Sequence, residues 1–423
     1  MINPKFVKWF SKQRKINKII TRVINLDKLD KWKLDNNKIY HTSNKFFKII
    51  GIKVISNFFK SNWDQPIIVQ NELGILGIIK DSKNNKYLLQ AKVEPGNKNK
   101  LQLSPTVQAT KSNYKGVHGG KKVPYIEYFL KDKKNKFVNQ SEQGFRYLYK
   151  FNSNSLINVK SIIKIKKNFF WFSLRDMLHL IKKKNIINMD TLSVLSSHIK
   201  KNNLDFPLVT KKKLRLWISK NDKKYFLTCT NVPLKKLKDW IYDKKEIIHK
   251  KKKHFSIIGV DIKTNEREVN TWSQPIVKGK DIAFVGYIIK KFNNTNHYLC
   301  RYILKPGLKN SAITCSVNTS DIKNYKKDRN LMNFQKELLN KIFFNTKYQN
   351  NKIFDNILSD EGGRFFHCQI RYVATLLKED FNFKLPKTYI WISQNQMVEM
   401  IKQKKIDIEA RLLFGCINLK NIY

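Results

Sequence analysis

Acidic residues are scarce in this chain of 423 residues. There are 84 Lys and Arg residues against 32 Asp and Glu residues, which gives a formal net charge of +52. Such a charge, taken alone, favours a nucleic-acid partner. The lysines are nevertheless spread along the whole chain together with many Asn and Ile residues, all encoded by A/T-rich codons, and the one dense run, Lys250–Lys253, is typical of a solvated loop. We therefore do not expect nucleic-acid binding, although a basic surface attracts anionic ligands.

Cysteine and long apolar runs are also scarce. The five cysteines are Cys229, Cys300, Cys315, Cys368 and Cys416. Their odd number and the lack of any Cys-x-x-Cys pair argue against a disulfide framework and a structural zinc site. Lys, Asn or Asp interrupts every apolar run before about 18 residues, so no membrane-spanning helix is expected. The segment 1–18 lacks a signal-peptide pattern, and we expect a cytoplasmic protein.

The motifs of several cofactor and metal enzymes are missing too. The chain has no Gly-x-Gly-x-x-Gly fingerprint of a dinucleotide site and no His-Glu-x-x-His pair of a zinc enzyme. We therefore predict chemistry that uses neither a redox cofactor nor a metal.

A long internal repeat is the main positive feature of the sequence. Motifs of the first half recur in the same order in the second half, 208 positions later at Gly259 for Gly51 and 220 positions later at Trp391 for Trp171. The other pairs are Trp63–Pro66 and Trp272–Pro275, Pro95–Gly96 and Pro306–Gly307, Asn113–Tyr114 and Asn324–Tyr325, and Ser141–Tyr147 and Ser359–Phe365. The period is far longer than that of a solenoid and indicates two homologous domains.

The repeat predicts how the chain is divided. The first module spans 39–200 and the second 247–423, with a helical lead-in over 1–38 and a connecting segment over 201–246. Each module has strand signals first and helix signals last.

In the first module, β-branched or alternating runs predict strands at 49–55, 75–79 and 86–93. Ser173 and Ser393 are suitable N-caps for a helix late in each module. We expect an α+β fold in which each module is a mixed or antiparallel sheet with helices.

The densest group of polar residues lies in the first module. Gln90, Lys92 and Glu94 alternate, so on a strand they share one face. A second alternating row, if extended, consists of Gln102, Ser104, Thr106 and Gln108. Two such rows facing each other would line a wet cleft, whereas either row alone could be the solvated face of an ordinary sheet.

Several strings in both halves together resemble the NDP-hexose 2,3-dehydratase family over nearly the whole chain. They are Glu94–Asn97, Leu103–Thr110, Ser112–Tyr114, Trp63–Pro66, Trp272–Pro275, Ser359–Phe365 and Asn188–Thr191. The resemblance implies two tandem Nudix-like modules per subunit and a homodimer. It implies a nucleotide-diphosphate sugar substrate, dTDP-4-keto-6-deoxyglucose or a near relative, in deoxysugar biosynthesis. The glutamate row of the Nudix metal helix is absent, so metal-dependent pyrophosphate cleavage is not expected.

The implied reaction is loss of water from the sugar. A base removes the C3 proton next to the C4 ketone, and the C2 hydroxyl then leaves with a proton from an acid, giving a 3,4-diketo-2,6-dideoxy sugar. Lys92 and Glu94 are our candidates for the acid/base pair, because neighbours two apart on a strand shift each other's pKa. His118 and Tyr114 are alternatives, although a His before Gly-Gly is often only a loop residue.

Other residues of these strings are candidates for substrate binding. Gln90, Thr106 and Gln108 suit sugar hydroxyls or the ketone. Arg146 and Arg364 suit the diphosphate, because a guanidinium binds oxygens with two parallel hydrogen bonds, although an ion pair with Glu142 is the alternative for Arg146. The remaining candidates are Trp63 and Trp272, which could stack on thymine or belong to the core, and Gln65, Gln274 and Asn113.

The second module departs from the first at the polar positions. Gln90, Lys92 and Glu94 align with Arg301, Ile303 and Lys305, and we align Ser104–Gln108 with Cys315–Thr319. A base in place of an acid cannot keep one proton-transfer role, so we expect the first module to be catalytic and the second to have a structural or weak nucleotide-binding role. A catalytically inactive nucleotide-sugar-binding homologue is the alternative reading of the whole chain.

Overall fold

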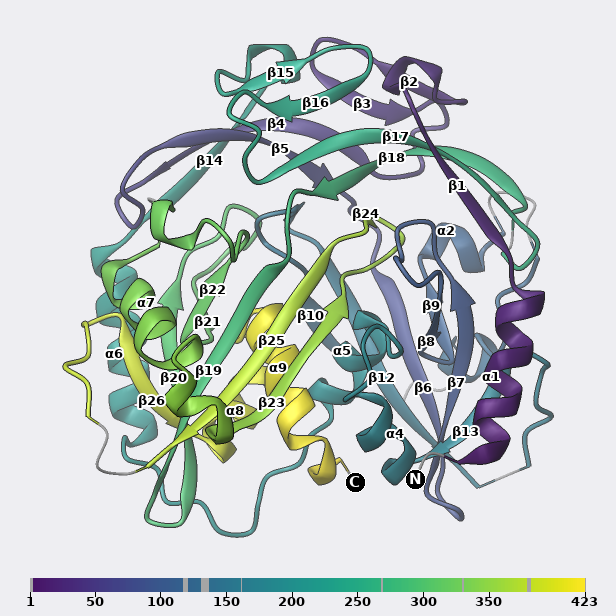
Figure 1. The fold of residues 1–423 in the computed structure, drawn as a ribbon. Coiled ribbons are helices and arrows are strands. Elements are labelled where there is room, and N and C mark those ends of the chain that lie inside the picture. Colours follow the sequence, from purple (N-terminus) through teal and green to yellow (C-terminus); the bar gives the residue numbers. More distant parts are fainter. Residues whose placement is uncertain are drawn as a thin grey trace.

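A computed structural model of the chain describes residues 3–116, 121–130, 137–160, 162–267, 269–328, 331–378 and 382–422. These residues form four mixed sheets and accompanying helices, arranged as two similar halves in tandem (Figure 1). The mixture of helix and sheet agrees with the expected fold class. Each sheet contains one parallel strand pair among antiparallel ones. No helix in the described part of the chain is long and apolar enough to cross a membrane.

Each half has one large sheet. In the first half it consists of β10 (Val138–Ser141), β12 (Phe151–Val159), β6 (Gly74–Asp81), β7 (Lys86–Val93) and β13 (Phe169–Ser173), with β8 (Leu101–Ser104) on β7 and β9 (Val107–Ala109) on β6. In the second half it consists of β23 (Lys352–Ser359), β25 (Gln369–Leu377), β19 (Ala283–Phe292), β20 (Thr295–Ile303) and β26 (Tyr389–Ser393), with β21 (Ala312–Thr314) on β20 and β22 (Val317–Thr319) on β19. The strands expected at 75–79 and 86–93 are therefore confirmed as β6 and β7.

The two small sheets lie together at the top of Figure 1. One contains β2 (Trp32–Leu34), β3 (Lys38–His41), β4 (Lys48–Ser56), β5 (Trp63–Val69) and β11 (Tyr147–Leu148). The other contains β15 (Trp240–Tyr242), β16 (Glu246–His249), β17 (Phe255–Thr264), β18 (Thr271–Gly279) and β24 (Phe365–Phe366). Their apolar faces share one core, in which Ile49 and Ile68 meet Ile257 and Val277. Burial of these faces against each other joins the halves.

The segments that precede each half exchange strands. Helix α1 (Pro4–Ile16) packs on the first half, and the next strand, β1 (Ile19–Ile24), pairs with β17 of the second half. The repeat equivalents are α6 (Lys211–Lys224) and β14 (Leu227–Val232), and β14 pairs with β4 of the first half. Residues 1–38 and 201–246 thus hold strands as well as helices, and each completes the small sheet of the other half.

The expected helix starts are confirmed. Ser173 caps α4 (Leu174–Leu180) and Ser393 caps α8 (Gln394–Lys402), each in a capping box with the third helical residue. The other helices are α2 (Lys111–Tyr114), α3 (Glu127–Leu130), α5 (Met189–Ser197), α7 (Asn333–Leu338) and α9 (Ile408–Asn418). Helices α5 and α9 cross at close range between the two large sheets, since a Cβ on Gly415 would lie 2.6 Å from the Ser196 side chain.

The Pro-Gly turns connect the halves a second time. The Gly96 amide donates a 2.8 Å hydrogen bond to the Gly362 carbonyl, and the Gly307 amide donates one of 2.7 Å to the Gly144 carbonyl. A Cβ on Gly96 would lie 1.9 Å from the carbonyl oxygen of Phe365. The turn of each half is therefore packed against the glycine-containing loop of the other half, and only glycine fits there.

Candidate active site

A cavity of about 90 Å³ lies at the end of β7, beside β9 and the start of α5. Both halves of the chain contribute to its wall. The lining residues are Gln70, Gly74, Leu76, Lys92, Glu94, Gln108, Ala109, Thr110, Asn113, Tyr147, Lys150, Asn152, Asp190, Arg267, Glu361, Gly363 and Arg364. Of the site residues predicted from the sequence, this cavity brings together Lys92, Glu94, Gln108, Asn113 and Arg364.

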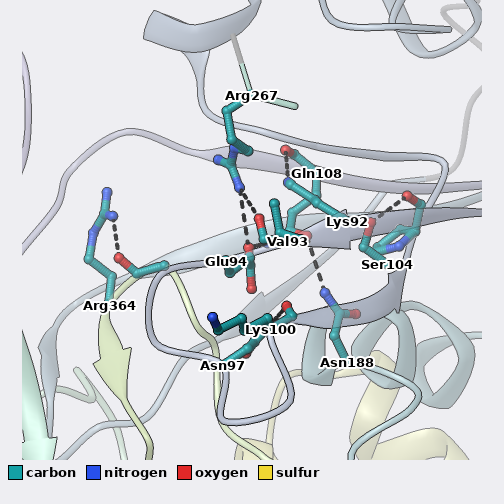
Figure 2. A network of polar contacts seen from close by, with 12 residues as sticks. Lys92, Val93, Glu94, Asn97, Lys100, Ser104, Gln108, Asn188, Arg267 and Arg364 are labelled. Atoms are coloured by element: carbon teal, nitrogen blue, oxygen red, sulfur yellow. Dashed lines mark hydrogen bonds and ion pairs between the residues drawn. The ribbon is translucent and has the colours of Figure 1, made fainter. Parts of the chain in front are cut away.

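Lys92 and Glu94 lie side by side around Gln108, as Figure 2 shows. Their side chains are 8% and 3% exposed. The Lys92 ammonium donates a 3.3 Å hydrogen bond to the Gln108 carbonyl, and the Gln108 side-chain amide donates one of 2.9 Å to Glu94 Oε1. Asn188, the N-cap of α5, donates to the Gln108 side-chain oxygen at 3.2 Å. Glu94 Oε2 is buried and has no hydrogen-bond partner among the described residues, so one carboxylate oxygen remains available.

The second half supplies two arginines to this cavity. Arg267 Nη1 lies 3.9 Å from Glu94 Oε1 and donates a 3.2 Å hydrogen bond to the Val93 carbonyl. The Arg364 guanidinium lies 4.2 Å from the centre of the Phe47 ring and donates to the Gly363 carbonyl at 2.8 Å. The Arg364 Nε atom is buried and has no hydrogen-bond partner among the described residues. Arg364 therefore retains hydrogen-bonding capacity for an anion.

Glu361 reaches the same cavity from the second half. The Tyr147 hydroxyl, from the first half, donates a 2.7 Å hydrogen bond to Glu361 Oε2. Both side chains line the cavity wall. Residues of both repeats thus form the wall of this one cavity.

Burial raises the pKa values of the acids around the cavity. Asp190, in the first turn of α5, is 3% exposed, and burial together with the charges of Glu361, Glu142 and Glu94 raises its pKa well above the usual range. Burial also raises the pKa of Glu361, and it raises that of Glu142 to about 7. The same loss of solvent lowers the pKa of the Lys150 ammonium.

The two Trp-x-Gln-Pro motifs position the arginine loops. Gln274 Nε2 donates a 2.7 Å hydrogen bond to the carbonyl of Gly363, directly before Arg364. In the first half, Gln65 Nε2 donates one of 2.8 Å to the carbonyl of Phe145, directly before Arg146. The tryptophan of each motif donates from its indole to the glutamine oxygen of the same motif, at 2.9 Å for Trp63 and 3.0 Å for Trp272. Gln65 and Gln274 are therefore engaged with protein atoms rather than exposed for a ligand.

A second cavity, of about 260 Å³, lies at the equivalent place in the second half. Trp63, Gln65 and Arg146 line it, together with Arg301 and Ile303. The structure thus places Arg146 at this cavity, where its guanidinium lies 4.1 Å from the centre of the Phe255 ring. Each arginine crosses from its own half to the cavity of the other half.

The second cavity differs from the first in its charged groups. Lys305, which replaces Glu94, is fully buried and forms ion pairs with Asp407 at 2.8 Å and Glu409 at 2.6 Å. These pairs neutralise Asp407 and Glu409, whose equivalents in the first half are Asn188, an uncharged amide, and Asp190. The sequence alignment of this region needs one correction. Because β22 pairs with β19 as β9 pairs with β6, Gln108 aligns with Asn318, one position earlier than expected.

The remaining predicted residues lie elsewhere. The Thr106 hydroxyl donates to the Leu88 carbonyl and accepts from the Ile79 amide at 3.0 Å, so it connects strands. Gln90 is paired in the sheet opposite Ser104 and, like Thr106, is outside the described lining of the first cavity. Tyr114 packs in an apolar cluster, and burial raises its pKa.

His118 falls outside the described residues. Trp272 packs against a large apolar core that includes Phe172, Val260 and Ile276.

Sequence reasoning missed several lining residues. Asp190 and Glu361 stand inside strings already quoted, but no local pattern shows that residues so far apart in sequence meet at one cavity. Tyr147 also stands in a quoted string, as the last residue of Ser141–Tyr147, whereas Arg267 and Lys150 gave no signal of their own.

The cavity defines a class of protein. Carboxyl groups with raised pKa values, a lysine and arginines converge on a buried space, an arrangement typical of an enzyme that moves protons on an anionic substrate. Comparison with known proteins gives the family. The chain matches the family described as NDP-hexose 2,3-dehydratase over residues 3–197 and 211–417, and it belongs to that family.

Curated relatives agree with this assignment. A dTDP-4-dehydro-6-deoxy-alpha-D-glucopyranose 2,3-dehydratase of Saccharopolyspora spinosa is 31% identical, with 97% of this chain and 90% of the relative aligned. The protein of the same name from Streptomyces violaceoruber is 31% identical over 97% and 96% of the two chains. That of Amycolatopsis orientalis is 29% identical over 97% and 89%. The two matched regions begin at α1 and α6, so the repeat includes the exchanged strands.

Proposed function

We propose that the first cavity removes water from dTDP-4-keto-6-deoxyglucose or a near relative. The observation that carries this proposal is the Glu94 carboxylate, held through Oε1 by Gln108 and bearing a second oxygen without a hydrogen-bond partner among the described residues. Glu94 takes the C3 proton, which the neighbouring C4 ketone makes acidic. Lys92 stabilises the negative charge that develops on the C4 oxygen. The product is a 3,4-diketo-2,6-dideoxy sugar.

The diphosphate of the substrate binds Arg364 in this proposal. Two contacts of the arginine, with Phe47 and Gly363, fix its position and leave its Nε atom available. Asn113 and Gln108 supply hydrogen bonds to the sugar from the opposite wall of the cavity. The reaction needs no redox cofactor, because the electron pair of the C3–H bond stays in the sugar: C2 is reduced as C3 is oxidised.

We propose further that each half is a Nudix-like module and that the enzyme is a cytoplasmic homodimer. The two similar halves with mixed sheets support the first part. The five cysteines are free, which suits a reducing compartment. Light scattering of the purified chain tests the dimer.

Incubation with dTDP-4-keto-6-deoxyglucose in deuterium oxide, followed by mass spectrometry and NMR, tests the function. We expect loss of water from the sugar, and a decrease of at least about 100-fold in turnover for Glu94→Gln. Lys92→Met is expected to reduce turnover while the protein stays folded. Arg301→Gln, which gives the second cavity the residue of the first at that position, serves as the matched control and should keep wild-type turnover.

Two outcomes contradict the proposal. Substrate that binds tightly but neither loses water nor gains deuterium at C3 identifies an inactive nucleotide-sugar-binding homologue. Equal loss of turnover in Arg301→Gln and Glu94→Gln places the chemistry at neither cavity alone.

A further inference from the structure

Glu94 and Asp190 occupy positions whose equivalents in the second half are in contact. Glu94 corresponds to Lys305, directly before the Pro-Gly turn. Asp190 corresponds to Glu409, each being the second residue of its helix. In the second half, Lys305 Nζ lies 2.6 Å from Glu409 Oε2. The backbone of this fold thus brings side chains at these two positions together.

In the first half both positions hold a carboxyl group, and both line the cavity. Two buried carboxyl groups facing each other are not both ionised at neutral pH, because their charges repel and lack solvent. Burial and the charges of Glu361, Glu142 and Glu94 raise the Asp190 pKa, and the Lys92 charge opposes the shift without cancelling it. Asp190 therefore carries a proton where Glu94 is the base.

Asp190 is not required to hold its helix. The N-cap of α5 is Asn188, whose Oδ1 accepts from the Thr191 amide and from the Thr191 hydroxyl, both at 2.9 Å. No hydrogen bond reaches the Asp190 carboxyl group from any residue that the structure describes. A buried acid without such partners destabilises the fold, and a function explains its presence.

We infer that Asp190 is the acid that protonates the departing C2 hydroxyl, an inference that rests on the proposed function. Glu94 takes the C3 proton and the C3–H electron pair forms the enolate. That pair then makes the C2–C3 double bond as the C2–O bond breaks. The Asp190 proton goes to the leaving oxygen, and one water is released. Transfer of the captured proton from Glu94 to Asp190 restores both groups, a step that requires the two carboxyl groups to lie together.

Asp190→Asn and Asp190→Glu test this role. We expect Asp190→Asn to lower kcat by about 100-fold or more, the usual contribution of a general acid, with little change in substrate affinity measured by calorimetry. Asp190→Glu is expected to recover about a tenth of wild-type kcat or more, because Glu409 shows that the helix position accommodates glutamate. Thermal unfolding of both variants checks that they fold.

A change of leaving group separates proton donation from a structural effect. The 2-deoxy-2-fluoro analogue of the substrate loses fluoride, which departs without a proton. On this analogue we expect the defect of Asp190→Asn to shrink to less than about tenfold. Glu94→Gln is expected to stay strongly impaired on both substrates, since the C3 proton must be removed in each case. Deuterium from the solvent should still enter C3 of the normal substrate in Asp190→Asn.

The outcomes distinguish this inference from the proposed function. If the wild-type protein does not turn over either compound, the proposed function fails, and the role of Asp190 fails with it. If the wild-type protein is active and Asp190→Asn is equally impaired on both compounds, or not impaired at all, Asp190 is not the acid, and the proposed function stands.

Discussion

Gln274 donates a 2.7 Å hydrogen bond to the main-chain carbonyl of Gly363, and this bond fixes the residue before Arg364. The Trp272–Pro275 motif is therefore bonded to protein atoms and positions Arg364, the residue proposed to bind the diphosphate. Its repeat equivalent, Gln65, has the same relation to Phe145 at the second cavity. The two motifs offer a matched pair of substitutions.

Gln274→Ala is expected to raise KM for the nucleotide sugar about fivefold with a smaller change in kcat, because loss of one hydrogen bond loosens the Arg364 loop. Gln65→Ala removes the same kind of bond but loosens the loop of Arg146 instead. Steady-state kinetics gives KM and kcat for both variants. Thermal unfolding checks that the two variants lose similar stability. An equal rise of KM in the two contradicts the role of Arg364.

Replacement of the arginines themselves tests which one holds the diphosphate. Arg364→Lys keeps the charge but loses the paired donors, so we expect KM to rise by about tenfold or more. Arg146→Lys makes the same change at the other cavity and is expected to alter KM less than about twofold. Calorimetric titration with dTDP gives the binding constants directly, and the reverse order of effects would place the substrate at the second cavity.

Gly96→Ala is expected to destabilise the protein by about 3 kcal/mol, because the new Cβ would lie 1.9 Å from the Phe365 carbonyl oxygen and must push the halves apart. Turnover should fall as well, since Glu94 directly precedes this turn. Gly307→Ala creates the equivalent clash with Tyr147 beside the second cavity. Urea unfolding measures both losses, and we expect turnover per folded molecule to fall more in Gly96→Ala.

The carboxyl group of Glu142 makes stability depend on pH. Burial raises its pKa from the ordinary 4.5 to about 7. Between these values the unfolded chain loses a proton that the folded protein keeps, so the free energy of unfolding falls as pH rises, by roughly 3 kcal/mol from this group. Glu142→Gln is therefore expected to raise the thermal midpoint at pH 8 and to change it little below about pH 4.5.

Asp355 serves as a control of opposite sign. The hydrogen bonds and charge of Arg371 hold the Asp355 pKa below its ordinary value despite partial burial. Its contribution to stability is present at neutral pH and is lost as pH falls through the lowered pKa. Asp355→Asn should thus lower the midpoint at pH 8, the opposite of Glu142→Gln. Thermal scans of the two variants at pH 8 check both signs, and scans of Asp355→Asn down to about pH 2 follow the loss of its contribution.

The sequence by itself determined the local elements and the duplication. Runs of β-branched or alternating residues predicted β6 and β7 with nearly their observed bounds. Ser173 and Ser393 marked helix starts through the hydrogen bonds that their side chains accept. Lys92 and Glu94 were found because residues two apart on a strand share a face, and the family was recognisable from strings of adjacent residues.

Only the tertiary structure decided which residues meet across the halves. Arg146 and Arg364 each reach the cavity of the other repeat, and β1 and β14 are exchanged between the halves. Both arrangements arise because the two small sheets bury their apolar faces against each other, which places the loops of one half over the other. Asp190 and Glu361 join Glu94 through contacts between segments far apart in sequence. Burial raises the pKa of both acids, the charge of Glu361 raises that of Asp190 further, and the charge of Glu94 raises that of Glu361. Neither shift can be read from neighbours along the chain.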